Sequence, residues 1–142
     1  MKRRSGRQET IKWIVRNKAV RTQRDLVLEL RDAGYTCTQA TISRDIADMG
    51  LRKLPEGLYV LAEDLHLQRM VSEFVTHVEN VNNQVVVRTQ PGTAPGVAAA
   101  IDAADLTDVI GSIAGNDTVL AISRSNEAAA VTAELIQKLR SI

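Results

Sequence analysis

The stretch TQATISRDIADMG, residues 38–50, decides how the rest of the chain is interpreted. At helical spacing its apolar residues, among them Ile42 and Ile46, share one stripe, and polar residues occupy the opposite side. Thr38 is suited to cap the first turn with its hydroxyl group, and Gly50 can close the helix in a left-handed conformation. The pattern predicts a short, sharply bounded helix with one face for packing and one for contact.

The contact face carries side chains that can reach the edges of DNA bases. An arginine forks onto guanine, a glutamine pairs with adenine, and hydroxyl groups suit a base or a phosphate. We therefore interpret the stretch as a DNA recognition helix, and the alternative is an ordinary amphipathic surface helix. The candidate DNA-binding residues on this face are Gln39, Thr41, Ser43 and Arg44.

Two supporting helices are predicted before this stretch. Ile11 and Ile14 give the first helix an apolar face, and Thr22 caps a second helix in which Leu26 and Leu30 face inward. Three helices with a tight turn before the third are the plan of a helix-turn-helix domain, whose last helix enters the major groove.

The residues after the stretch predict a small hairpin. Residues 51–54 and 58–61 form its strands, and the turn falls at residues 55–57. The hairpin makes a wing, in which Arg52 and Lys53 are placed to reach phosphates. The sequence therefore predicts a winged helix-turn-helix DNA-binding domain over residues 1–64.

Charge is unevenly divided along the 142 residues, although the net charge of the chain is only +1. Residues 1–53 hold 13 Lys and Arg against 6 Asp and Glu, whereas residues 54–142 hold 5 against 11. A basic N-terminal half indicates a polyanionic partner, and an acidic C-terminal half indicates a part that does not touch it. The division favours two small domains with different tasks.

Cysteine usage and hydropathy indicate a cytoplasmic protein. Cys37 is the single cysteine, so an intrachain disulfide is impossible and a reducing compartment is expected. The sequence has no apolar run of membrane-spanning length, and the basic start MKRRSGR lacks the apolar run of a signal peptide. We expect no association with a membrane.

A change to polar composition from Ala62 to about Gln68 predicts a linker that runs into a helix, and the domain boundary is placed there. Alternating and apolar runs then predict a hairpin over residues 77–89. The loop PGTAPG, residues 91–96, precedes a helix over residues 97–104. A second hairpin over residues 108–123 turns at Gly115-Asn116-Asp117.

A closing helix completes the predicted second domain. Asn126 is expected to cap it, with Val131 and the following leucines and isoleucine facing inward. The order α-β-β-α-β-β-α predicts an antiparallel sheet with helices on one side, so the fold class is α+β and residues 65–142 form an α/β domain. Its apolar strand VVV and helix VAAAI indicate that this domain also buries surface against copies of itself.

Catalytic and metal-binding constellations are not evident. His66 and His77 are the two histidines, and with a single cysteine they give no zinc spacing. The loop PGTAPG lacks the Gly-Lys-Ser/Thr of a phosphate-binding loop. We expect neither an enzyme nor a metal site.

Over essentially its whole length the chain resembles the bacterial arginine repressors. Three segments carry the resemblance, and their order and spacing make it specific. They are TQATISRDI at residues 38–46, PGTAPGVAAAID at residues 91–102, and GSIAGNDTVLAI at residues 111–122. The resemblance implies a DNA-binding domain joined to an oligomerisation domain that forms trimers and, by stacking two of them, hexamers.

The resemblance further implies L-arginine as corepressor, bound at the trimer–trimer interface, and double-stranded operator DNA of arginine metabolism genes as partner. A guanidinium requires carboxylates in a planar two-point geometry, which Asp102 and Asp117 are placed to supply. Main-chain groups near Thr93, Ala94 and Ala114 are candidates for the amino-acid end of the ligand.

Two positions depart from the family pattern. Asn116 stands where the family usually has Asp, and Pro95 stands where many members carry a polar side chain. The expected function is an arginine-dependent repressor of arginine biosynthesis genes, with activation of catabolic genes where operator position allows. The alternatives are an effector-independent oligomeric DNA-binding or architectural protein, and a repressor that responds to a different amino acid.

Overall fold

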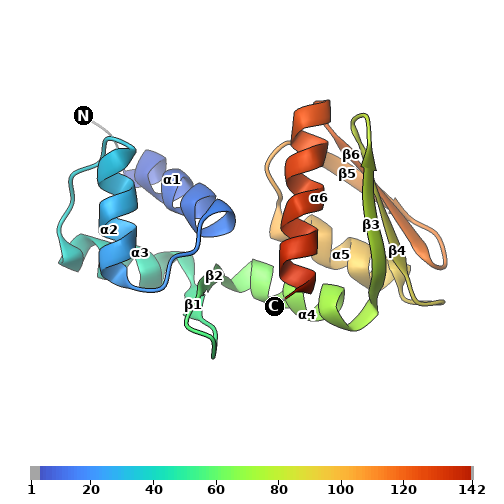
Figure 1. Cartoon of the computed structure of the whole chain (residues 1–142), viewed down its shortest axis with the longest axis horizontal. Coiled ribbons are helices and arrows are strands. Elements are labelled where there is room, and N and C mark those ends of the chain that lie inside the picture. Colours follow the sequence, from blue (N-terminus) through green and yellow to red (C-terminus); the bar gives the residue numbers. More distant parts are fainter. Residues whose placement is uncertain (1–3, 142) are drawn as a thin grey trace. The chain divides into compact units, whose positions relative to one another are not determined.

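The computed structural model describes residues 4–141, so the first three residues of the basic start and the final residue lie outside it. The chain divides into two compact units, one ending at Leu65 and the other beginning at His66. Figure 1 labels the helices and strands of both units.

The first unit is a winged helix-turn-helix, as predicted. Its three helices pack around one aliphatic cluster, in which Ile11, Leu30 and Ile42 are fully buried. The wing strands pair antiparallel and place Leu51 opposite Leu61, both of which join the cluster. The elements are α1 (Arg4–Asn17), α2 (Gln23–Asp32), α3 (Gln39–Met49), β1 (Leu51–Lys53) and β2 (Tyr59–Leu61).

The predicted linker over residues 62–68 is wrong, because these residues begin the helix α4 (Ala62–Phe74) directly after β2. Its polar start consists of acidic residues in a first turn, where the helix dipole favours negative charge. Further along, Leu67 and Val71 are fully buried at the i, i+4 spacing of one helical face. Composition alone did not distinguish a polar first turn from a loop.

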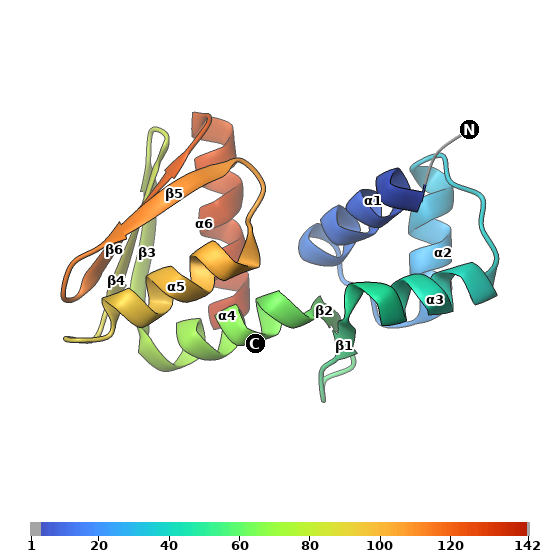
Figure 2. The ribbon, with the colours of Figure 1, turned by 180° about the vertical axis from the view of Figure 1, so that it is seen from behind.

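The second unit is an antiparallel four-stranded sheet in the order β3-β4-β6-β5. Figures 1 and 2 show α5 and α6 on the same face of this sheet, as predicted. Val85 and Val119 of the central strands are fully buried against Ile136 of α6, within one apolar cluster. The elements are β3 (Val75–Val81), β4 (Gln84–Thr89), α5 (Ala94–Ala104), β5 (Val109–Ala114), β6 (Thr118–Ser123) and α6 (Asn126–Arg140).

Three details of this unit differ from the sequence prediction. Helix α5 begins at Ala94 rather than at residue 97, since Pro95 fits within its first turn. Ser125, not Asn126, caps α6, because its hydroxyl accepts from the Ala128 N–H at 3.0 Å. Val131 is 51% exposed, since the buried stripe of α6 is formed by other residues, several of them small.

The face of the sheet opposite the helices carries an apolar surface. Residues paired across neighbouring strands point to the same face of the sheet. Leu120 pairs with Ile113 on one side and with Val86 on the other, so these three residues share a face. Ile113 is 73% exposed, and Val81 at the far edge is 50% exposed. We refer to Val81, Val86, Ile113, Leu120 and Ile122 as the outer apolar face.

Candidate functional site

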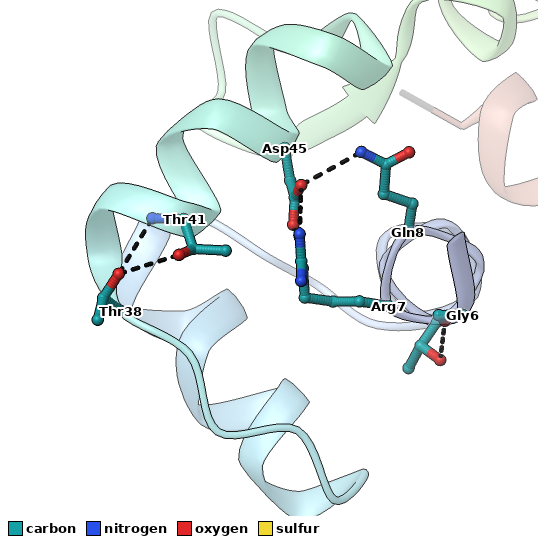
Figure 3. Close-up of polar contacts among 7 residues, drawn as sticks. Gly6, Arg7, Gln8, Thr38, Thr41 and Asp45 are labelled. Atoms are coloured by element: carbon teal, nitrogen blue, oxygen red, sulfur yellow. Dashed lines mark hydrogen bonds and ion pairs between the residues drawn. The ribbon is translucent and has the colours of Figure 1, made fainter. Parts of the chain in front are cut away.

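Helix α3 is fixed at both ends by the residues that its sequence predicts. The Thr38 hydroxyl accepts from the Thr41 N–H at 3.2 Å, and the two hydroxyl groups lie 3.1 Å apart, as Figure 3 shows. Gly50 adopts φ 67° at the C-cap, a left-handed conformation that favours glycine. Between the caps Ile42 is fully buried, whereas Arg44 is exposed. The predicted contact face is therefore accessible.

Gln23, at the first position of α2, contacts two of the predicted base readers. Its Oε1 accepts from the Ser43 hydroxyl at 3.2 Å and from Gln39 Nε2 at 3.5 Å. When Ser43 donates its hydroxyl proton to Gln23, its oxygen lone pairs remain to accept from the amino group of a base. Gln23 was missed in the sequence, because the contact joins two helices through residues 16 to 20 positions apart.

Asp45 is a buried carboxylate on the packing side of α3, and it was missed in the sequence as well. It is 1% exposed and accepts from Arg7 Nε at 2.5 Å and Arg7 Nη2 at 3.0 Å. Gln8 Nε2 adds a third donor at 3.2 Å (Figure 3). The hydrogen bond to Asp45 raises the pKa of Arg7 above its ordinary value, and burial opposes that shift. The available signal was an aspartate three residues after Ile42, on the buried stripe.

The wing presents the two predicted cations to solvent. Arg52 and Lys53 are exposed on β1, and Lys53 Nζ lies 5.5 Å from the centroid of the Tyr59 ring. Arg21, which precedes α2, donates from Nη1 to the Glu56 carbonyl oxygen at 2.9 Å and so holds the wing turn. The geometry suits contacts to phosphates on a nearby strand of DNA.

In the second unit, the structure brings five of the six predicted effector residues together. The Asn116 carbonyl oxygen accepts from the Gly92 N–H at 3.0 Å and from the Ala94 N–H at 3.4 Å. The Asp117 carbonyl oxygen accepts from the Thr89 N–H at 2.8 Å. The β5–β6 turn is thereby joined to the start of α5, with Thr93 beside it and Ala114 at the end of β5. The Ala94 N–H is already used within this loop.

Asp102 lies elsewhere in the unit, in the last turn of α5. It is eight residues beyond Ala94, which corresponds to about 12 Å along the helix axis. It accepts from the Ser112 hydroxyl at 2.9 Å and lines a hollow of about 360 Å³ together with Asp105 and Ile110. Figure 2 shows α5 running away from the β5–β6 turn. Within a single chain, Asp102 is not brought to Asn116 and Asp117.

Comparison with known proteins assigns both units to one family. Residues 2–67 match the family described as "Arginine repressor, DNA binding domain", and residues 71–138 match "Arginine repressor, C-terminal domain". The chain belongs to the arginine repressor family. Family membership makes the first unit a DNA-binding domain and the protein a DNA-binding transcriptional regulator, not an enzyme.

Individual arginine repressors align along almost the whole chain. The protein of that name from Moorella thermoacetica is 38% identical, with 94% of this chain and 95% of the relative covered. The arginine repressor of Carboxydothermus hydrogenoformans is 39% identical over 85% of this chain and 88% of its own length. That of Thermus thermophilus is 39% identical over 91% of this chain and 85% of its own length.

Within residues 4–141, no helix has the length and apolar character needed to span a membrane. The same described residues contain no group of three or more His, Cys, Asp or Glu side chains that could hold a metal ion.

Proposed function

We propose that this chain is an arginine-dependent repressor of arginine biosynthesis genes that binds double-stranded operator DNA in the cytoplasm, and that it activates catabolic genes where operator position allows. The observation that carries the proposal is the exposed face of α3, held between two caps in a domain of the arginine repressor family. Residues 1–64 act as the DNA-binding domain, and residues 65–142 act as the oligomerisation and effector domain.

On the DNA, α3 lies in the major groove and Arg44 reads a base. Arg44 is exposed near the middle of the helix, where its guanidinium can fork onto the O6 and N7 of guanine. Gln39, Ser43 and Thr41 contribute further contacts to bases or phosphates. Arg52 and Lys53 of the wing contact phosphates, which adds affinity for every sequence alike.

The effector is L-arginine, and its site is formed between copies of the chain. Asp102 lies at one end of α5, and Asn116 with Asp117 lies at the other. One guanidinium is too small to contact Asp102 and the Asn116-Asp117 turn of the same chain, given the estimated separation of about 12 Å along α5. We therefore propose that Asp102 of one copy and the Asn116-Asp117 turn of another hold the same ligand, with main-chain groups near Thr93 and Ala114 at its amino-acid end.

Self-association through the second unit supports this arrangement. The outer apolar face exposes large aliphatic side chains on a sheet that has helices on its other side. Exposed apolar surface of this kind marks a site of protein association. The proposed assembly is a trimer and, by stacking of two trimers, a hexamer, which holds several DNA-binding domains together and raises affinity for paired operator sites.

Isothermal titration calorimetry on the full-length protein tests the effector assignment, with arginine, ornithine, citrulline and lysine as ligands. We expect arginine to bind tightest, because only its guanidinium combines a planar two-point contact to carboxylates with a positive charge. Binding of citrulline in preference to arginine would assign the site to a neutral ligand. Binding of none of the four would favour an effector-independent DNA-binding protein.

Mixed oligomers test whether the site is shared between copies. Asp102→Asn and Asp117→Asn variants, each impaired alone, are unfolded together and refolded so that copies mix within one assembly. If the site takes Asp102 from one copy and Asp117 from another, some sites in the mixture regain both carboxylates and arginine binding partly returns. A site built within one chain would give no recovery.

The fragment of residues 70–142 tests the proposed division of labour. It contains the buried core of the second unit except Leu67, and we expect it to form oligomers and bind arginine without DNA. Sedimentation that finds only monomers, with arginine and without it, would contradict the assembly.

A further inference from the structure

We infer that the buried ion pair between Arg7 and Asp45 sets the orientation of α3, so that Arg7 and Asp45 are positioning residues for base recognition. The inference rests on the proposed function, because it assigns the pair a role in reading DNA. Neither residue is among the predicted DNA contacts. Both belong to the part of the protein that lies beneath the contact face.

The pair joins the first turns of α1 to the middle of α3. The Asp45 side chain is 2% exposed and that of Arg7 is 17% exposed, and the two residues are 38 positions apart in the sequence. Two guanidinium nitrogens and Gln8 Nε2 donate to this one carboxylate. Figure 3 shows that Arg7 and Gln8 both approach Asp45 from α1.

A two-point contact constrains rotation in a way that aliphatic packing does not. A guanidinium fork bonds both oxygens of a carboxylate only when the two groups approach in one plane. Around it, α3 packs through Ile42 and half-buried Ile46, and aliphatic contacts tolerate a small rotation. A rotation of about 20° moves each Cα by roughly 0.8 Å, given a helix radius of about 2.3 Å, and moves a long side chain further.

The position of Asp45 next to the proposed base reader makes such a rotation matter. Arg44 precedes Asp45 in the chain, and Arg7, Thr41, Arg44, Asp45 and Asp48 line one hollow of about 180 Å³ on the first unit. Binding sites function when their groups are held within about 0.5 Å and 10–20° of the productive geometry. Loss of the fork therefore displaces Arg44 by more than a bidentate base contact tolerates.

The same unit contains a matched control. Arg16 donates from Nε and Nη2 to Asp64, each at 2.8 Å, and the two side chains are 6% and 4% exposed. This pair is also bidentate and buried, and it also starts from α1, but its carboxylate belongs to α4 rather than α3. If any buried ion pair of this unit supported base recognition equally, removal of either pair would have the same effect on DNA binding.

The test replaces each pair by apolar residues of similar size, since such replacements avoid an uncompensated buried charge and commonly keep the fold. The variants are Arg7→Met with Asp45→Leu, and Arg16→Met with Asp64→Leu as control, both in the full-length protein with arginine. Each is titrated, at one salt concentration, against a duplex that the wild-type protein enriches from a random-sequence library and against a shuffled duplex of equal composition. Circular dichroism and thermal unfolding verify that the variants fold.

We expect the Arg7/Asp45 variant to lose about tenfold or more in the ratio of affinities for the enriched and the shuffled duplex. Its affinity for the shuffled duplex stays near the wild-type value, and the control pair keeps the wild-type ratio. Arg7→Lys alone is the second variant, because it preserves the charge and removes the fork. Arg7→Lys should lower the same ratio of affinities to a smaller extent. It tests the inference even if the double variant does not fold.

Three results would overturn the inference. The first is that both double variants keep the wild-type ratio of affinities, and the second is that both lose it equally. Either result would mean that the orientation of α3 depends on neither pair in particular. Alternatively, affinity for both duplexes falls together with a shallower salt dependence, which would make Arg7 a phosphate contact. A wild-type protein that enriches no sequence would instead overturn the proposed function, and the inference with it.

Discussion

Replacement of Arg44 by alanine should weaken operator binding by about 5- to 150-fold without affecting oligomerisation. Arg44 is exposed near the middle of α3, and alanine preserves the helix because it has the highest helix propensity. Loss of a bidentate contact to a base costs about 1–3 kcal/mol, and each 1.4 kcal/mol corresponds to a factor of about ten in affinity. Since the side chain is exposed, the free energy of unfolding should change by no more than about 0.5 kcal/mol.

Fluorescence anisotropy with a labelled operator duplex measures this loss, and Arg31→Ala is the matched control. Arg31 is an exposed arginine in the last turn of α2, so its removal subtracts the same charge from the same unit without altering α3. The loss for Arg44→Ala should be confined to the operator and should relax discrimination at one base pair. Wild-type operator affinity for Arg44→Ala, or an equal loss for Arg31→Ala, would refute the assignment of Arg44 as a base reader.

Three further predictions concern other parts of the chain. Asn116→Asp should tighten arginine binding by about tenfold or more, since a hydrogen bond to a charged group contributes about 1.5–3 kcal/mol. Calorimetry that finds equal or weaker binding would contradict a cationic ligand at this turn. Gly50→Ala should lower the free energy of unfolding by about 1–2 kcal/mol, because the left-handed backbone at Gly50 disfavours a residue with a Cβ. Steric overlap is not the cause, since that Cβ would meet the nearest side-chain atom at an ordinary 3.5 Å. An unchanged urea midpoint would contradict the backbone explanation. Burial raises the pKa of the Cys37 thiol, so its alkylation at pH 7 should be slower than that of a free cysteine and should accelerate as pH rises. The charge of Arg7 opposes that shift in pKa and the charge of Asp45 adds to it, so Asp45→Asn should accelerate alkylation of Cys37, and an unchanged rate would contradict the electrostatic contribution.

The features of the fold that follow from local sequence were predictable. Thr38 and Gly50 have the side chain and the backbone freedom that their cap positions require, and both occupy those positions. The hairpin turns and the order of helices and strands also agree with the apolar periodicity. The errors at residues 62–68 and at Ser125 concern helix starts, where polar residues suit a first turn, a cap and a loop alike.

Residues of the candidate site were predictable only where the exposure of a side chain on a single helix or strand was enough to identify them. Arg44 is a candidate because a single helix places it opposite Ile42. Asp45 and Arg7 were missed because their contact joins residues 38 positions apart, and no local pattern indicates which cation meets a buried carboxylate. The separation of Asp102 from the β5–β6 turn depends in the same way on the course of α5 through the folded unit.

Control of sequence-specific DNA binding by arginine is the property on which the proposed function depends. An anisotropy titration of the enriched duplex with full-length protein, with and without arginine, measures it at fixed salt, and citrulline serves as the neutral control. We predict that arginine tightens binding to this duplex by a factor within the usual range of allosteric coupling, about 5- to 150-fold, and that citrulline has a smaller effect. Equal affinity with and without arginine, for a protein that still prefers the enriched duplex over the shuffled one, would refute arginine control.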